Sequence, residues 1–175
     1  MTKIIIVGKS WGWKTTLSDH LEENYNYNIP QNYTTRPPRS WDDKDYSEYR
    51  FVSNLHFNHL KENWELLNWT EFNWNQYWTW KELYWDDVVF VVDQTWREDL
   101  LKHFPDAVTV WVEIDWFTRR KRLFDRGLRG EDLESRLDWP SEQMTPTNSC
   151  IIIDGTIPVE ESAKKLIDNI NANEQ

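Results

Sequence analysis

Short apolar runs and helical stretches alternate along the chain. The apolar runs end at glycine or polar positions, which is typical of strands buried on both faces of a sheet. They cover residues 3–7, 65–72, 87–93, 107–115 and 150–154, with shorter strand-like stretches near Tyr33 and at 48–52. Most are followed by a stretch of helical pattern, at 15–23, 53–63, 97–103, 117–126, 131–137 and 159–170.

This alternation predicts an α/β fold in which helices cover both faces of a parallel sheet. The segment from about Arg36 to Thr79 departs from the alternation because it is richer in aromatic, strand-like residues, and we expect it to form an inserted lobe. The 175 residues fit a single domain, 1–175, and are enough to bury a core. No repeat or low-complexity linker divides them.

The first strand leads into the sequence VGKSWGWKTT, residues 7–16. In a phosphate-binding loop of the pattern G-x-x-x-x-G-K-[ST], backbone N–H groups and a helix N-terminus hold the phosphates of a nucleotide. Gly8, Lys14 and Thr15 occupy the positions that this pattern requires. Trp13 breaks the pattern, because its position needs the positive φ and the open space that glycine supplies. From this segment alone, a chance strand–turn–helix is the alternative.

Composition and charge exclude several classes of function. A net charge of -10 and a pI of about 4.9 argue against nucleic-acid and membrane partners. Cys150 is the single cysteine, so a disulfide framework and a cysteine-based zinc site are excluded. The opening apolar run is too short for a signal peptide or a membrane span, and we therefore expect a soluble cytoplasmic protein.

Four further segments follow the loop in order: TTRPPRSWDD…EYRFV, LLNWTEFNWNQYWT, VVFVVDQTW and RLFDRGLRGEDLESRL. Together with the loop they resemble guanylate kinases, over residues 3 to about 138. The resemblance implies a P-loop NTPase-type α/β fold with a core (1–33 and 84–175), an inserted lobe that binds the nucleoside monophosphate (about 34–83) and a lid (about 122–138). It also implies that ATP, with Mg²⁺, phosphorylates GMP or dGMP.

The resemblance assigns three groups of site residues. ATP would be held by Gly8, Lys9, Ser10, Gly12, Lys14, Thr15 and Thr16, with Mg²⁺ on Thr15. The acceptor nucleotide would be held by Arg36, Arg39, Tyr49, Asn68, Tyr77 and Thr79. Catalysis would use Lys14, Asp93, Arg122, Arg126 and Arg136. Both substrates are polyanions, so several cations must be positioned around them to offset their repulsion. The alternatives are a solvated helix face for the lid arginines, an exposed turn for Arg36 and Arg39, helix capping for Asp93 and plain packing for the tyrosines.

Tryptophan stands at eight positions where this family has, or commonly has, glycine. They are 11, 13, 41, 64, 74, 78, 85 and 96. The chain has 13 Trp and only 5 Gly, against about 12 Gly expected from average usage. We hypothesise that many of these positions are UGA codons that the source organism reads as glycine. A degenerate or deliberately altered chain is the alternative. Trp69 and Trp111 lie inside predicted strands and are expected to be ordinary core aromatics.

Three departures from the family pattern leave parts of both nucleotide sites open. Asn68 stands where the family reads guanine with a glutamate, and Asn32 replaces the serine that contacts guanine, so the acceptor base is open. Asp154-Gly155 replaces an expected asparagine, so the contact with the ATP ribose is open as well. An asparagine cannot accept two hydrogen bonds from guanine as a carboxylate does. The alternatives are a related kinase with another acceptor, and a catalytically inactive module that holds phosphopeptides, although such a module would not need Lys14 or the lid arginines. A sugar-binding surface built of exposed tryptophans is a third interpretation.

Overall fold

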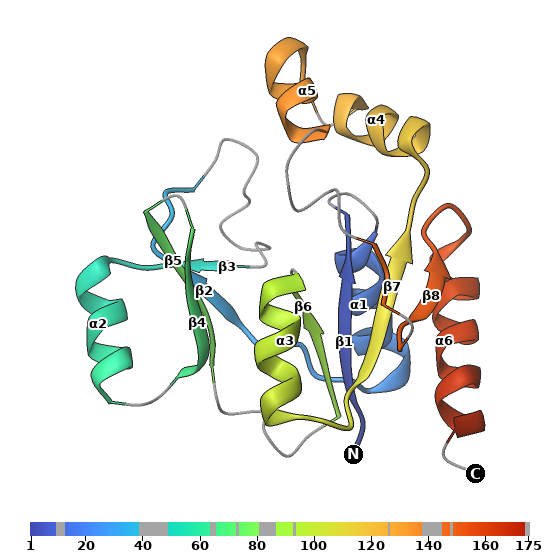
Figure 1. The fold of residues 1–175 in the computed structure, drawn as a ribbon, viewed down its shortest axis with the longest axis horizontal. Coiled ribbons are helices and arrows are strands. Elements are labelled where there is room, and N and C mark those ends of the chain that lie inside the picture. The colour runs from blue at the N-terminus through green and yellow to red at the C-terminus, as the bar shows by residue number, and fades with distance from the viewer. Residues whose placement is uncertain are drawn as a thin grey trace.

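The computed structural model contains two sheets within the residues it describes (Figure 1). The described residues are 1–9, 13–38, 49–63, 66–72, 74–80, 87–92, 94–125, 127–137, 145–147 and 149–173. The strand order in the first sheet is β6-β1-β7-β8, and every neighbouring pair is parallel. These strands are β1 (Lys3–Gly8), β6 (Val88–Val91), β7 (Val108–Glu113) and β8 (Ile151–Asp154). The predicted α/β fold is confirmed.

Helices cover both faces of this parallel sheet (Figure 1). They are α1 (Lys14–Tyr25) and α6 (Val159–Asn173) on one face and α3 (Gln94–His103) on the other. Successive side chains of a strand point to opposite faces. Ile4 and Ile6 therefore pack in the core beside α1 and α6, whereas Ile5 and Val7 pack in the core beside α3. All four side chains are fully buried, which explains the unbroken apolar run seen in the sequence.

The second sheet is built from the segment between α1 and β6. Its order is β3-β2-β5-β4, with β2 parallel to β3 and β5 antiparallel to both of its neighbours. The strands are β2 (Asn32–Thr34), β3 (Tyr49–Phe51), β4 (Leu66–Phe72) and β5 (Asn75–Trp80). Strand β5 and its hairpin with β4 were not predicted. The sequence of β5 mixes polar and aromatic residues, and its turn carries Trp74 where a hairpin signal has glycine.

Helix α2 (Asn54–Glu62) packs on this second sheet and begins where the sequence predicted. The Ser53 hydroxyl accepts a hydrogen bond from the His56 N–H at 3.2 Å, which caps the helix. Phe57 of the helix contacts Trp78, with ring centroids 4.7 Å apart, and Trp78 stacks on Tyr33 at 5.3 Å. These aromatic side chains form a second, smaller core, separate from that of the parallel sheet.

Helices α4 (Trp116–Asp125) and α5 (Gly130–Leu137) follow the carboxyl end of β7 and lie at one end of the molecule, at the top of Figure 1. Both match their predicted positions closely. They share a small core of their own, made of Leu123, Leu128, Leu133 and Leu137. Arg120 forms an ion pair with Glu134, and the buried Arg119 donates a hydrogen bond to the Leu137 carbonyl at 3.4 Å. The two helices are thus tied directly to each other.

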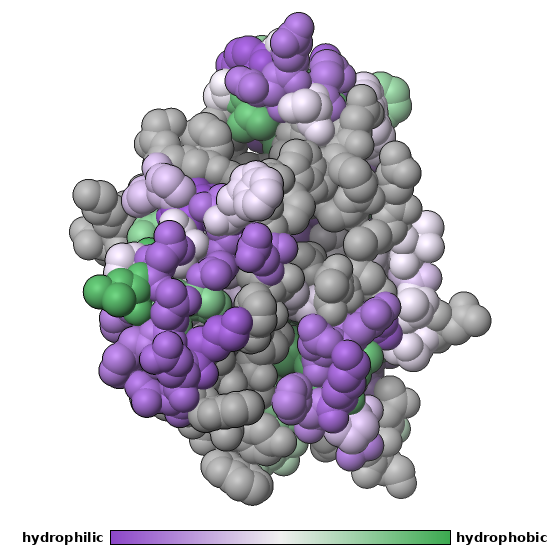
Figure 2. Space-filling model, turned by 60° about the vertical axis from the view of Figure 1, so that its left-hand side comes forward, coloured by the Kyte–Doolittle hydropathy of each residue, from purple (hydrophilic) through white to green (hydrophobic). Residues whose placement is uncertain are grey.

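Hydrophilic residues predominate on the described surface in Figure 2, and hydrophobic ones appear only in small separate groups. The large exposed hydrophobic residues are Met1, Leu55, Trp74, Trp116, Phe117, Phe124 and Ile152. Trp74 lies in the β4–β5 turn and Trp116 opens α4, so these two exposed tryptophans belong to different elements and form no stripe on one strand face. A search of the described helices finds none with the length and apolar character needed to cross a bilayer.

Candidate functional site

The carboxyl ends of the parallel strands gather the predicted site residues at one edge of the sheet. Gly8 ends β1, Asp115 follows β7, and the turn at Asp154 and Gly155 follows β8. Because the strands are parallel, the loops after them meet at the same edge, which is where open α/β sheets bind ligands. Asp93, predicted at the same edge after β6, lies outside the described residues.

Gly8 is required by the close approach of two strands. Its φ is 144°, and a Cβ at this position would lie 2.6 Å from the carbonyl oxygen of Val112 in β7. No L-amino-acid side chain fits such a contact with backbone. The close approach of β1 and β7 therefore requires glycine at the end of β1. Ser10 and Gly12 of the predicted phosphate-binding loop lie outside the described residues.

Lys14 opens helix α1 and turns its side chain back across the loop. Its Nζ donates to the carbonyl oxygens of Gly8 and Lys9, at 2.9 and 3.0 Å. The cation is thus held at the mouth of the loop, beside the helix N-terminus that would face an anion. Thr15 follows it in the first turn and is partly buried, whereas Thr16 is exposed.

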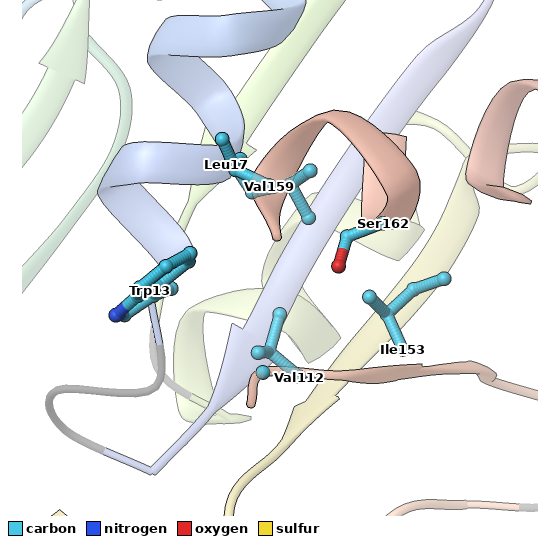
Figure 3. Close-up of a pocket in the computed structure, with 7 residues that line it drawn as sticks. Trp13, Leu17, Val112, Ile153, Val159 and Ser162 are labelled. Atoms are coloured by element: carbon cyan, nitrogen blue, oxygen red, sulfur yellow. The ribbon is translucent and has the colours of Figure 1, made fainter. Parts of the chain in front are cut away.

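Trp13 stands directly before this helix in the left-handed region, at φ 64° and ψ 20°. Its carbonyl oxygen accepts the Leu17 N–H at 2.8 Å, so the residue is fixed in the first turn of α1. Its indole lies under the Arg122 guanidinium, 4.5 Å from the ring centroid, in a cation–π contact. The indole also lines a small pocket at the start of α1 (Figure 3). The other lining residues are Leu17, Val112, Ile153, Gly155, Val159 and Ser162.

Arg122 connects α4 to the turn after β8. Its Nη2 donates to the Gly155 carbonyl oxygen at 2.9 Å. Of the three predicted lid arginines, it is the one whose side chain the structure describes. Arg126 lies outside the described residues, and Arg136 is placed in α5 by its backbone alone. The Arg122 side chain thus reaches the carboxyl edge of the parallel sheet.

Two carboxylates fix the turns on either side of this contact. Asp115 accepts the Thr118 hydroxyl at 2.6 Å and the Thr118 N–H at 2.9 Å at the start of α4. These hydrogen bonds, the hydroxyl first, lower the pKa of Asp115 from its ordinary value. Asp154 accepts the hydroxyl and N–H of Thr156 at 2.6 and 2.8 Å, which lower its pKa in the same way. The sequence predicted this role for neither Asp115 nor Asp154, because the hydrogen bonds of each carboxylate depend on a tight local turn.

The second sheet aligns polar residues in rows across its strands. The register pairs Asn32 of β2 with Thr79 of β5, and Thr79 with position 68 of β4. Asn32 and Thr79 are buried, and the Thr79 hydroxyl donates to Asn32 Oδ1 at 2.8 Å. Trp78, the neighbour of Thr79, points to the opposite face, toward α2. Asn32, which the resemblance ties to the base, and Thr79, a predicted acceptor-binding residue, therefore lie together. For Asn68 the structure gives the backbone register alone.

Arg36, Tyr49 and Tyr77 come from three different segments near this row. Tyr49 pairs with Asn32 in the β2–β3 register, and its ring meets that of Tyr77 edge to face at 5.7 Å. The Arg36 N–H donates to the Thr34 hydroxyl at 3.1 Å, and its guanidinium lies 5.3 Å from the Phe51 ring centroid. The described part of the predicted acceptor site is thus assembled on one sheet. Arg39 lies outside the described residues.

Two features of the site were missed in the sequence. The Asn32–Thr79 hydrogen bond joins residues far apart in the chain, and no local pattern announces it. Arg119, in the basic run, is buried and holds α4 to α5, although its sequence neighbours suggested a solvated face. Among the described residues, no group of three or more His, Cys, Asp and Glu is placed to hold a metal ion.

Comparison with known proteins gives consistent results. No protein-family model matches the chain. It is similar to the guanylate kinase of Aromatoleum aromaticum, with 37% identity over 145 residues, which cover 77% of this chain and 70% of that protein. The guanylate kinase of Helicobacter pylori is 31% identical over 148 residues, which cover 77% of this chain and 69% of that protein.

Solved structures share the same fold. A guanylate kinase from Anaplasma phagocytophilum matches with a TM-score of 0.63 at 16% identity, covering 98% of this chain and 85% of that one. A gluconokinase from Sinorhizobium meliloti matches with a TM-score of 0.54 at 13% identity, covering 99% and 98%. At such identities the structural likeness establishes the fold alone.

Proposed function

This chain belongs to the guanylate kinase family of phosphotransferases, and we propose that it transfers the γ-phosphoryl group of ATP to a nucleoside monophosphate, with GMP or dGMP preferred. One observation carries the proposal: two cations converge at the start of α1. Lys14 lies across the loop carbonyls, and Arg122 reaches over the preceding residue from the other side of the site. Phosphoryl transfer needs such positioned cations, because charge spreads over the oxygens of the transferred group.

The donor side would hold ATP with its Mg²⁺. Lys14 would exchange its hydrogen bonds to the carbonyls of Gly8 and Lys9 for the β- and γ-phosphates. Mg²⁺ takes few protein ligands and keeps several waters and phosphate oxygens. The partly buried Thr15 hydroxyl, one residue after Lys14 in the first turn of α1, suits one of these positions. Ser10, Gly12 and Thr16 would complete the loop, and Asp93 would order a water or the substrate.

The Trp13 indole does not fit this arrangement. It lies against the Arg122 guanidinium, and this contact would have to be broken before Arg122 could bind a phosphate. This conflict concerns one side chain, since Gly8, Lys14, Thr15 and Arg122 all agree with the proposal.

The acceptor side would use the second sheet. Arg36 and Arg39 would bind the acceptor phosphate in bidentate fashion, and the hydroxyls of Tyr49 and Tyr77 would assist. Thr79 and Asn68 would meet the base. Because Asn68 offers one acceptor where a glutamate offers two, we expect weaker discrimination for guanine than a carboxylate gives.

The lid would be residues about 122–138, which include the end of α4 and all of α5. The core would be 1–33 and 84–175, and the acceptor lobe about 34–83. Closure of the lid would bring Arg122, Arg126 and Arg136 over the transferring phosphoryl group. Closure would also exclude water, which otherwise hydrolyses ATP without an acceptor.

A coupled assay of ADP formation tests the proposal. The chain as written and its W13G variant would each be given Mg·ATP with GMP, dGMP, AMP, CMP or UMP. We expect turnover that depends on GMP or dGMP, and a loss of about 10²–10³ in kcat when Lys14 is replaced by Met. Preference for another monophosphate would identify that nucleotide, and not GMP or dGMP, as the acceptor. Absence of turnover with every acceptor, in both forms, would refute the kinase proposal.

One observation favours a second candidate, a non-catalytic module. The Trp13 indole lies against Arg122, one of the arginines that phosphoryl transfer would need. If the protein is a non-catalytic module, ATP should raise the melting temperature of neither the chain as written nor W13G. If it is a kinase, ATP should raise the melting temperature of W13G.

A further inference from the structure

The described tryptophans occupy two kinds of backbone conformation. Three non-glycine residues in the described chain have a positive φ: Trp13 at 64°, Asn26 at 60° and Trp74 at 62°. Asparagine adopts this left-handed region readily because its short side chain bonds locally, and Asn26 caps the end of α1. A bulky side chain there is an outlier. Both tryptophans therefore stand where the backbone favours glycine.

The hairpin between β4 and β5 makes the case at position 74 without reference to any site. Phe72 pairs with Asn75, so residues 73 and 74 form a two-residue connection. Such connections require positive φ, and Asn-Gly is their strongest sequence signal. The chain reads Asn73-Trp74, and the Trp74 side chain is 92% exposed. Because the indole is exposed, it makes no packing contacts that would offset the strain of its backbone.

Position 13 makes the same case inside the phosphate-binding loop. Trp13 follows Gly8 in a loop whose backbone must curl tightly, and its φ is positive. Its indole lies against Arg122 and lines the small pocket at the start of α1. Figure 3 shows the ring at the first turn of α1, where the pocket opens.

Trp111 and Trp78 differ from these two, because they are buried in strands and do not have a positive φ. Trp111 is buried in β7, and its Nε1 donates to Glu113 Oε2 at 2.5 Å. Trp78 is buried between the rings of Tyr33 and Phe57 without a positive φ, although its buried Nε1 has no hydrogen-bond partner among the described residues. The contrast separates positions 13 and 74 from these two by conformation, not by composition.

We infer that the protein made in its native host carries glycine at positions 13 and 74, because the codons written here as tryptophan are read there as glycine. An excess of tryptophan and a shortage of glycine follow from the same cause, since the chain has 13 Trp and 5 Gly. At position 13 the inference bears on the site of the proposed function, but it does not rest on that function, because position 74 lies outside the site. Glycine at 13 would remove the indole from its contact with Arg122 and would allow the loop backbone to surround a triphosphate.

Peptide mass spectrometry of the protein from its host reads the two residues directly. Tryptic cleavage at Lys9, Lys14, Lys61 and Lys81 gives fragments 10–14 and 62–81, which contain them. Glycine at 13 and 74 is expected. Tryptophan at both positions would overturn the inference.

Recombinant variants test the physical reasoning separately. We expect W74G to unfold about 2–4 °C above the chain as written, whereas W74A, which removes the same exposed ring but keeps a Cβ at positive φ, should show at most a small part of this gain. Equal melting temperatures for W74G and W74A would contradict the backbone argument.

The loop is tested by nucleotide affinity. W13G should bind ATP about tenfold or more tightly than the chain as written. W116A is the matched control, since Trp116 also pairs with an arginine, Arg120, at 5.3 Å but lies outside the loop; its ATP affinity should not change. If the host protein carries glycine and W74G is stabilised but W13G does not bind ATP, the proposed function fails and the inference stands.

Discussion

Replacing Gly8 by alanine tests the geometry on which the phosphate-binding loop depends. The added Cβ would meet the Val112 carbonyl oxygen at 2.6 Å, and Gly8 has a φ of 144°, which L-residues rarely adopt. The contact is with the backbone of a fully buried neighbouring strand, so no flexible side chain can yield. The substitution must push β1 and β7 apart or distort the loop.

The magnitude has two parts. Backbone strain at a disfavoured φ costs on the order of 1–3 kcal/mol, and overpacking against a rigid neighbour costs about 1–3 kcal/mol more. Alanine returns about 0.4–1 kcal/mol by restricting the unfolded chain. We expect G8A to lower the free energy of unfolding by about 2–4 kcal/mol.

Gly127 supplies the matched control. Its φ is 100°, and a Cβ there would meet no atom within 4 Å. G127A therefore carries the strain without the clash, and we expect a loss of about 1 kcal/mol. Urea unfolding, followed by circular dichroism with an unchanged m-value, measures both variants. If G8A were as stable as G127A, the close approach of β1 and β7 would not constrain the loop, and the reasoning would be wrong.

Three other predictions concern acidity, the lid and the acceptor sheet. Folding lowers the pKa of Asp115 and Asp154, so their contribution to stability is present above the unfolded value of about 3.9 and is lost as pH falls through the folded values. Melting temperature measured below pH 4 should fall less steeply in D115N and D154N than in the parent. R122A should reduce kcat by about 10²–10³ in the coupled assay with little change in melting temperature, whereas loss of the fold would contradict a role in transfer. N32A should cost about 1–3 kcal/mol in urea unfolding, because it leaves the buried Thr79 hydroxyl without its acceptor; the double variant N32A/T79V should recover part of this.

Features encoded by neighbouring residues could be predicted from the sequence. The run from Lys3 to Val7 has to be a buried strand because it is apolar on both faces, and Ser53 has to cap a helix because its hydroxyl precedes a helical pattern. The place of Lys14 between a strand and a helix could also be predicted, because the apolar run before it and the helical pattern after it fix its position within a few residues.

Features that join distant segments could not be predicted in this way. The Asn32–Thr79 bond depends on the register of three strands, and β5 itself carries no apolar run that would mark it. The burial of Arg119 depends on the packing of α5 against α4, which the charged sequence of both helices conceals. The loop pattern predicted a positive φ at position 13, but the Asn73-Trp74 pair gives no local signal for the positive φ of Trp74, because such a φ is inferred from glycine.

The leucine core between α4 and α5 makes that pair a cooperative unit of its own. Leu123 and Leu133 are shielded by each other and not by the parallel sheet, and the Arg120–Glu134 pair closes the same unit. In native-state hydrogen exchange its amides should open together, at a lower free energy than those of β1. We expect the sheet to stay protected while this end of the molecule fluctuates, once the Arg122–Gly155 hydrogen bond has opened.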